Sequence, residues 1–136
     1  MTNGQRPLEA LHLALWVAQV VLAASFIWAA GMKLFQPVSK LAAMWPWVLH
    51  VADNLVKFTG IVDLLGAIGL IIPSLLRIKP KLTAIASIGI IVLMIAASVF
   101  HIARGEALVI GVNIAFAVIA AFIAWGRFSK TIILSK

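Results

Sequence analysis

Four long stretches of this chain contain no Lys, Arg, Asp or Glu. They cover residues 11–32, 64–76, 82–102 and 107–126. A helix needs about 20 mostly apolar residues to cross a hydrocarbon core of about 30 Å. Three stretches reach that length alone, and the second reaches it when it is extended back through Asp63 to Phe58. The sequence therefore predicts four membrane-spanning helices, at about 11–33, 57–76, 82–103 and 107–126.

The composition indicates the same class of protein. Only 11% of the residues are charged and 64% are apolar, whereas soluble domains carry about 25% charged residues. A net charge of +7 would suggest nucleic-acid binding in a soluble protein. Membrane proteins, however, collect Lys and Arg at their cytoplasmic ends, so no nucleic-acid partner is expected. We expect one domain over residues 1–136, an all-α integral membrane four-helix bundle.

Two further features limit the chemistry of the chain. It contains no cysteine, which excludes disulfides, thiolate metal sites and a dithiol relay within the chain. The first apolar run is longer than the 7–15 residues typical of a signal peptide, so we expect it to be retained as a span.

The segment between the first two spans mixes polar and apolar residues. Pro37 breaks any continuation of the first helix, and apolar residues then recur at helical spacing beside polar ones. This pattern predicts an amphipathic segment that lies at the membrane interface. Trp45 and Trp47 suit headgroup depth, either as a structural anchor or as a lid over a pocket. Pro46 could open a helix that runs on into the second span.

The basic residues predict the topology. Seven of them lie near the N-terminus, in the turn at 77–81 and in the C-terminal tail, and four lie at the other side of the membrane. By the positive-inside rule, both termini are expected in the cytoplasm. The seven are Arg6, Arg77, Lys79, Lys81, Arg127, Lys130 and Lys136, and the four are Lys33, Lys40, Lys57 and Arg104.

Polar residues from every span are expected in the outer half of the bundle. They are Lys33, Asp63, His101, Arg104 and Asn113, with Glu106 in the loop that follows the third span. Exposing an unpaired carboxylate to lipid costs a free energy of roughly several kcal/mol. We therefore expect Asp63 to face the bundle interior and to meet Lys33, His101 or Arg104.

This cluster could hold the polar head of a membrane-soluble molecule such as a quinone or a lipid. His101 could relay a proton, because an unperturbed histidine titrates at about 6.5. The alternative is that Asp63 and a basic partner only tie the helices together. A metal site is not expected, because one His, one Asp and one Asn beside two cations make a poor ligand set. The sequence identifies no catalytic residue.

At these residues the chain resembles the DoxX-like family of small four-helix membrane proteins. The resemblance rests on three motifs, one in each of the first three spans: residues 31–34 (GMKL), 60–73 (GIVDLLGAIGLIIP) and 96–105 (AASVFHIARG). A Glu is frequent in the family where this chain has Asp63, so the carboxylate is kept but shortened.

The resemblance implies a four-helix bundle in a bacterial cytoplasmic membrane. Some relatives are subunits of quinone-linked sulfur-oxidising enzymes, and others are associated with membrane redox complexes. The leading hypothesis is therefore an accessory subunit of a membrane redox or stress-response complex, with a quinone or lipid head-group site. The alternatives are a non-catalytic scaffold of a larger membrane complex and a small-molecule carrier. Protein partners or a homo-oligomer are compatible with each.

Overall fold

A computed structural model of the protein describes residues 5–136. Within these residues the chain forms α-helices joined by short helical turns, and no strand is present. The five α-helices are α1 (Gln5–Phe35), α2 (Val38–Met44), α3 (Asp53–Leu76), α4 (Lys81–Ala103) and α5 (Gly111–Trp125). The short turns are η1 (Pro46–His50), η2 (Ala107–Val109) and η3 (Gly126–Lys130), the last of which has π-helical geometry.

The four long helices lie where the uncharged stretches predict them. Helices α1, α3 and α4, and α5 together with η3, are each long and apolar enough to cross a membrane. Large apolar side chains such as Val92 and Val118 point outward along them, 61% and 63% exposed. Because hydrocarbon is as apolar as these side chains, the surface suits a bilayer. The all-α membrane bundle is confirmed.

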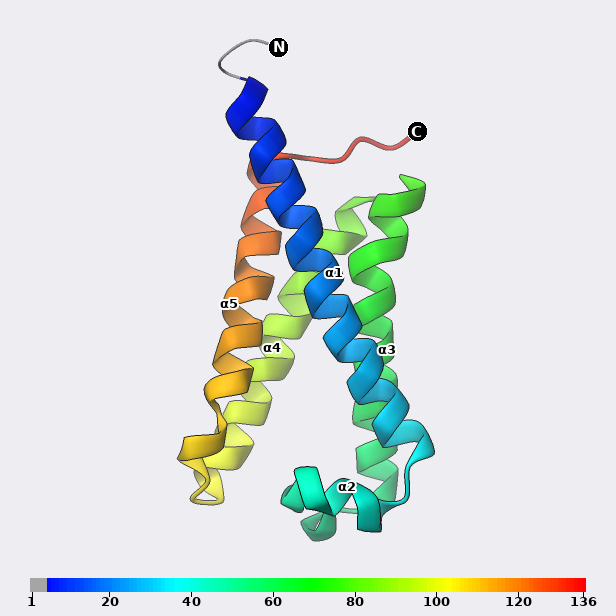
Figure 1. The fold of residues 1–136 in the computed structure, drawn as a ribbon, viewed down its shortest axis with the longest axis vertical. Coiled ribbons are helices and arrows are strands. Elements are labelled where there is room, and N and C mark those ends of the chain that lie inside the picture. The colour runs from blue at the N-terminus through cyan, green and yellow to red at the C-terminus, as the bar shows by residue number, and fades with distance from the viewer. Residues whose placement is uncertain (1–4) are drawn as a thin grey trace.

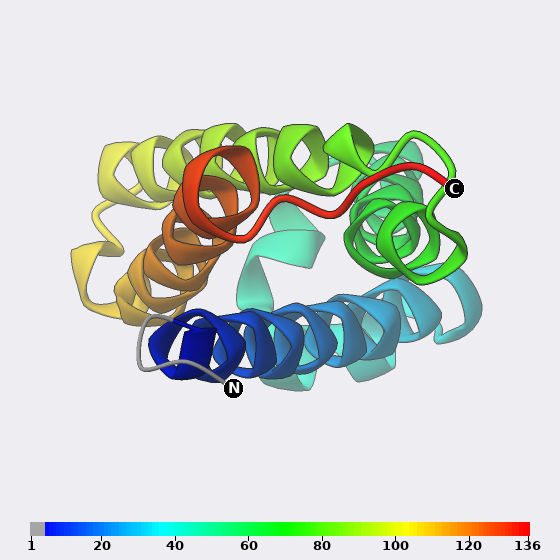
Figure 2. The same ribbon diagram turned by 90° about the horizontal axis from the view of Figure 1, so that it is seen from above.

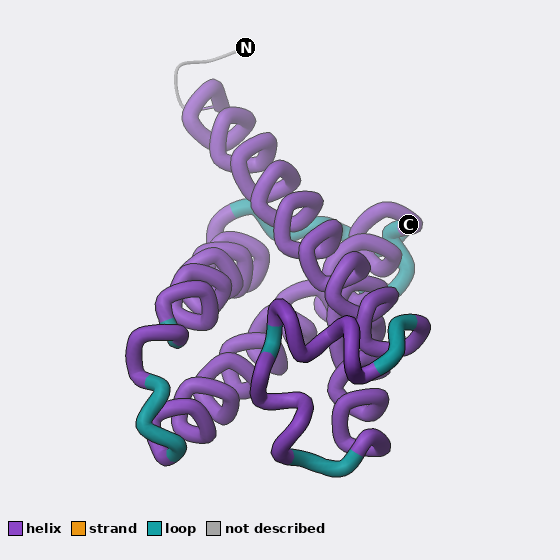
Figure 3. The backbone as a smooth tube through the Cα atoms, turned by 60° about the horizontal axis from the view of Figure 1, so that its bottom comes forward, coloured by secondary structure: helices purple, strands orange, loops and turns teal. Residues whose placement is uncertain are grey.

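The helices are arranged as two packed pairs. Helix α1 packs along α3, and α4 packs along α5, as Figure 1 shows. Contacts of α3 with α4 join the pairs. The first turns of α1 and the C-terminal residue lie at one end of the molecule, and α2 with η1 lies across the opposite end (Figures 1 and 3). The molecule therefore has a terminal end and an α2 end.

A hydrophobic core fills the space between the pairs. Phe26 of α1 contacts Phe116 of α5 edge to face, with ring centroids 5.5 Å apart. Around them lie Leu22, Leu70, Ile90, Met94, Ala120 and Ile123, all buried. Small residues bring helices close together: a Cβ atom added at Gly69 would lie 2.7 Å from Cβ of Ala86 on α4. The backbones of α3 and α4 are in close contact here because neither residue has a larger side chain.

Two helix boundaries differ from the sequence expectation. Pro46 does not open a helix that continues into the second span; it opens the turn η1, which ends at His50, and α3 begins at Asp53. The fourth helix begins at Gly111 rather than at 107, after the separate turn η2. Hydropathy gives the length of an apolar run, but it does not distinguish an α-helix from a 3₁₀ turn of the same composition.

The C-terminal residues 131–136 cross the terminal end of the bundle. They run from η3 to the turn between α3 and α4, as Figure 2 shows. There Nε of Arg77 donates a hydrogen bond of 2.9 Å to the Leu134 carbonyl, and the Lys136 amide donates one of 3.1 Å to the Arg77 carbonyl. The tail thus connects the end of α5 to the neighbouring pair of helices.

Candidate functional site

Lys33 and Asp63 form an ion pair between α1 and α3. The distance from Nζ of Lys33 to Oδ2 of Asp63 is 2.8 Å, and their side chains are only 14% and 6% exposed. The carboxylate therefore faces the bundle interior and meets a cation there. Of the three cationic partners that the sequence allows for Asp63, the structure selects Lys33.

A glycine next to the pair lets the two helices approach. A Cβ atom at Gly60 would lie 3.0 Å from Cβ of Lys33 and 3.3 Å from Cγ of Leu34. Gly60 stands one turn before Asp63, so the close contact sets the level at which the lysine meets the carboxylate. Nζ of Lys57 also donates a hydrogen bond of 3.3 Å to the carbonyl of Leu34, at the end of α1. This carbonyl is one that the helix itself leaves without a partner.

Two tryptophans of the α2 end cover the lysine. Nζ of Lys33 lies 5.6 Å from the ring centroid of Trp45 and 5.8 Å from that of Trp47. A cation at this distance is attracted by the electron-rich face of an indole ring. Trp45 also contacts Trp28 of α1 edge to face at 5.7 Å. The interfacial segment is therefore docked onto α1 by aromatic contacts above the ion pair.

His101, Arg104 and Glu106 form a second group at the end of α4. Glu106 accepts hydrogen bonds from Nε of Arg104 at 2.5 Å and from Nδ1 of His101 at 3.5 Å. The hydrogen bond from Arg104 is the main cause that lowers the pKa of Glu106 below its ordinary value of 4.5. Both basic residues thus pair with Glu106 and not with Asp63, because His101 and Arg104 lie only five and two residues before Glu106, across one local turn.

An aromatic bridge joins the two groups. Phe100 of α4 lies edge to face with Trp47, at a centroid distance of 6.2 Å, and next to the ring of His101 at 5.3 Å. The guanidinium of Arg104 lies 5.4 Å from the same phenyl ring. The ion pair of α1 and α3 is thereby linked to the polar end of α4 through Trp47 and Phe100.

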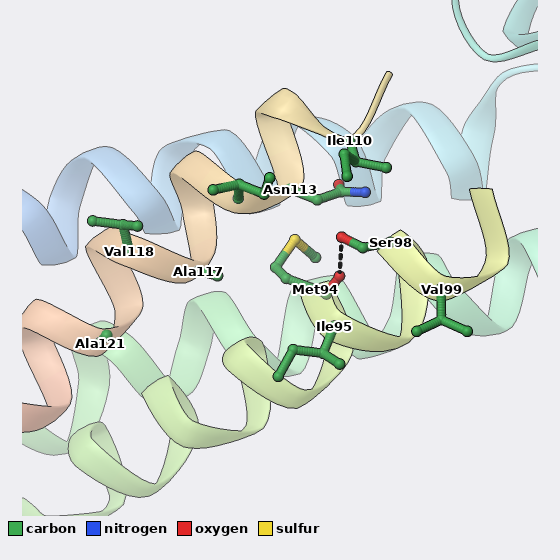
Figure 4. A pocket seen from close by; sticks show the side chains of 10 residues that line it. Met94, Ile95, Ser98, Val99, Ile110, Asn113, Ala117, Val118 and Ala121 are labelled. Atoms are coloured by element: carbon green, nitrogen blue, oxygen red, sulfur yellow. Dashed lines mark hydrogen bonds between the residues drawn. The ribbon is translucent and has the colours of Figure 1, made fainter. Parts of the chain in front are cut away.

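Asn113 occupies a third place, in a groove between α4 and α5. The groove has a volume of about 420 Å³ and is lined mostly by apolar side chains, with Asn113 and Ser98 as its polar members. Figure 4 shows both side chains directed into the same space. Ser98 donates its hydroxyl to the Met94 carbonyl at 2.8 Å, whereas the Asn113 amide forms no hydrogen bond within residues 5–136. The five site residues expected from the sequence are thus divided among three places.

Among the described residues, no three His, Asp or Glu side chains come together as a group that could hold a metal ion. The cationic and aromatic surroundings of Lys33 and Asp63 suit an oxygen-rich or aromatic group instead. A lysine ammonium donates up to three hydrogen bonds, and a carboxylate accepts several. The pair can therefore bind a carbonyl, hydroxyl or phosphate group, and it can exchange a proton with one.

A further polar cluster lies at the terminal end and was missed as a site. Arg127, counted in the sequence only as a topology-setting charge, is 5% exposed. It donates hydrogen bonds to Gln19 of α1 at 2.7 Å and to His12 at 2.9 Å. Gln19 in turn donates to the Leu70 carbonyl of α3 at 2.7 Å, so its side chain joins α1 to α3. The available signal was a glutamine in the first span that needs a partner at the level where the fourth span ends.

Comparisons with known proteins agree with this architecture. The sequence profile of the DoxX-like family matches residues 17–123, which include all of α3 and α4, most of α1 and α5, and the two groups around Asp63 and Glu106. No curated protein and no solved structure shows a significant match. The match covers most of the chain, and the protein therefore belongs to the DoxX-like family and is a small multi-pass integral membrane protein.

Proposed function

We propose that this protein is an accessory subunit of a membrane redox or stress-response complex. In this role it holds the polar head group of a membrane amphiphile, a quinone or a lipid, at the Lys33–Asp63 pair. The ligand enters from the bilayer at the α2 end, and Trp45 and Trp47 cover its head group. Both termini lie in the cytoplasm, and the α2 end belongs to the outer leaflet.

The observation that carries this proposal is the buried ion pair beneath two indole rings. Lys33 and Asp63 are 2.8 Å apart and largely buried, in a layer where ionisable groups are expensive and usually serve a function. Within the described chain, the Lys33 ammonium forms one hydrogen bond, to Asp63, although it has three donors. The remaining donors can bind an oxygen atom of a head group, and the indole rings can contact an aromatic head group such as a quinone.

A scaffold is the second candidate, and one feature of the same pair favours it. Each partner already neutralises the charge of the other, and the pair joins α1 to α3. A buried ion pair can exist solely to fix two helices in register, without binding any ligand. In a scaffold, the exposed apolar faces of the helices would contact partner proteins, and no bound amphiphile would be required.

Ligand retention separates the two candidates. The protein and its Lys33→Met, Asp63→Asn double variant are purified from native membranes in mild detergent, and co-purifying quinones, lipids and proteins are identified by mass spectrometry. We expect one class of quinone or lipid to be enriched with the protein and lost from the double variant. The matched control is Lys40→Met, which removes an exposed lysine of α2 at the same end of the bundle and should retain the ligand.

Complementation tests the cellular role with the same variants. A deletion strain is challenged with oxidative or sulfur stress, and membrane insertion and thermal stability of each variant are measured in parallel. Loss of complementation by a folded double variant supports the head-group site. Full complementation together with unchanged ligand content would leave the scaffold as the better description.

A further inference from the structure

The guanidinium of Arg127 is buried at the terminal end of the bundle, far from the Lys33–Asp63 pair. It belongs to the π-helical turn η3 that follows α5, and π-helical turns frequently occur at functional sites. Gly126 allows this turn to lie against α1, because a Cβ atom there would collide with the side chain of Leu15. The side chain of Arg127 is consequently enclosed between α1, η3 and the start of the C-terminal tail.

Within residues 5–136, the groups that accept hydrogen bonds from this cation are all neutral. Nε donates to Oε1 of Gln19 at 2.7 Å, and Nη1 lies 2.9 Å from Nδ1 of His12. Nη1 also donates to the carbonyl and the hydroxyl of Thr131, at 3.0 and 3.1 Å. The face of the Trp16 indole lies 5.7 Å from the guanidinium carbon. Since Nδ1 of His12 accepts from a guanidinium, the ring is neutral and carries its proton on Nε2.

The guanidinium lacks two things that a buried cation requires. Its Nη2 atom is buried and has no hydrogen-bond partner in the described chain. The ion pairs found within residues 5–136 involve Lys33, His101 and Arg104, and none of them involves Arg127. A buried charge that is neither neutralised nor fully hydrogen-bonded is costly. A negatively charged oxygen that accepts a hydrogen bond from Nη2 would supply both missing interactions of Arg127.

We propose that Arg127 is the core of an anion site that binds a phosphate group, with the phosphate oxygen accepting a hydrogen bond from Nη2. Guanidinium groups bind phosphate through charge-assisted hydrogen bonds. The surrounding surface attracts anions, because the same end carries exposed basic residues that draw in anionic head groups. The residues nearest the neighbouring turn between α3 and α4 and the start of α1 supply this attraction: Arg6, Arg77, Lys79 and Lys81.

Ligand entry requires a small side-chain movement. Nη2 is closed off in this structure, and the side chains beside the guanidinium are the partly buried Trp16 and the exposed His12. We expect a rotation of Trp16, whose ring lies 5.7 Å from the guanidinium carbon, to open Nη2 towards the headgroup layer. The phosphate then comes either from a phospholipid head group or from free phosphate in solution, and the experiment distinguishes these sources.

The test uses lipid retention by the full-length protein. The protein is purified, incubated with mixed micelles containing phosphatidylglycerol and an uncharged diacylglycerol, and analysed by native mass spectrometry. We expect Arg127→Gln to bind phosphatidylglycerol about tenfold more weakly, the size of effect that one hydrogen bond to a charged group produces. The matched control is Lys130→Gln, which removes the same charge from an exposed side chain of the same turn and should change binding less than about twofold.

A second measurement separates the two phosphate sources and does not depend on a folded variant. The melting temperature of the unaltered protein in lipid-free detergent is followed with added inorganic phosphate and with added phosphatidylglycerol. Stabilisation by both assigns the site to phosphate in general, and stabilisation by the lipid alone assigns it to the head group. Equal losses in Arg127→Gln and Lys130→Gln, or no stabilisation of the unaltered protein by either compound, would overturn the proposal.

Discussion

Arg127 and Gln19 are 108 positions apart in the chain, and Nε of the arginine donates a hydrogen bond of 2.7 Å to Oε1 of the glutamine. The amide group of Gln19 uses its other end to donate to the Leu70 carbonyl, also at 2.7 Å. One side chain thereby joins η3, α1 and α3. The amide orientation is fixed from both sides, because the guanidinium can only donate and the carbonyl can only accept.

Replacing Gln19 with Leu should destabilise the protein by about 1–3 kcal/mol, because the change leaves a buried donor of Arg127 and the Leu70 carbonyl without partners. The measurement is the free energy of unfolding in detergent. Ser25→Ala is the control, since that hydroxyl donates a hydrogen bond to the Val21 carbonyl of its own helix and joins no second helix among the described residues. A Gln19→Leu variant as stable as the Ser25→Ala variant would show that water or other groups replace the lost partners.

The contact of Gly69 with Ala86 predicts a rescue. Gly69→Ala places a methyl group 2.7 Å from Cβ of Ala86, and such overpacking costs about 1–3 kcal/mol. The double change Gly69→Ala, Ala86→Gly moves the methyl group to the other helix and should recover most of the lost thermal stability. Gly89→Ala is the control, because no atom lies within 4 Å of an added Cβ there; it should leave the protein unchanged or slightly more stable. If the double variant is as unstable as Gly69→Ala, the loss of stability does not come from the contact with Cβ of Ala86.

The sequence predicts the spans well because hydrophobic length is a local property. Uncharged stretches of about 20 residues are visible without knowledge of the neighbours, and the four long helices occur there. The predicted helix starts at Pro46 and at residue 107 were wrong because a short 3₁₀ turn and an α-helix can have the same composition. Backbone geometry at these points is set by contacts with other segments.

The site residues illustrate a different limit. Depth along each helix placed Lys33, Asp63, His101 and Asn113 in one layer, but depth does not fix the direction in which a side chain points. Lys33 meets Asp63 because Gly60 lets α1 approach α3, whereas Asn113 points into a separate groove. Arg127 was overlooked because a charge just after an apolar run usually lies in the headgroup layer, and its burial depends on Gly126 and Leu15.

The ion pair of Arg104 and Glu106 predicts a pH response at the turn after α4. The pKa of Glu106 is lowered mainly by the hydrogen bond from Arg104, so the pair stabilises the turn fully above the ordinary pKa of 4.5. This contribution is lost as the pH falls through the lowered pKa of the folded state. At neutral pH the Gly105 and Glu106 amides should therefore exchange more slowly in the parent protein than in Glu106→Gln. This difference should disappear as the pH falls through the lowered pKa of Glu106. Identical protection in both proteins at neutral pH would show that the pair contributes nothing to the turn.

Membrane topology can be measured with single cysteines, because the natural chain has none. Lys79→Cys lies in the turn between α3 and α4, and Leu108→Cys lies in η2, where the leucine is fully exposed. The positive-inside rule predicts that a membrane-impermeant maleimide added to intact cells labels position 108 and not position 79. Permeabilised cells, in which both positions should react, provide the control. The opposite labelling pattern would place the termini outside and the Lys33–Asp63 pair in the inner leaflet.

The last prediction concerns the energy of the Lys33–Asp63 pair itself. Removing one partner leaves the other charge buried without compensation, so Lys33→Met and Asp63→Asn should each destabilise the protein by about 3–5 kcal/mol. The double variant removes both charges and should lose much less than the sum of the two single variants, because neither charge remains in the low-dielectric interior. The free energy of unfolding of all four proteins, measured in the same detergent, gives the coupling. Additive losses would mean that each residue is compensated separately, by water or by another group, and that the pair is not the unit joining α1 to α3. A strong coupling combined with normal stability of the double variant makes that variant suitable for the ligand-retention experiment, since any loss of the amphiphile then reflects the chemistry of the pair rather than misfolding.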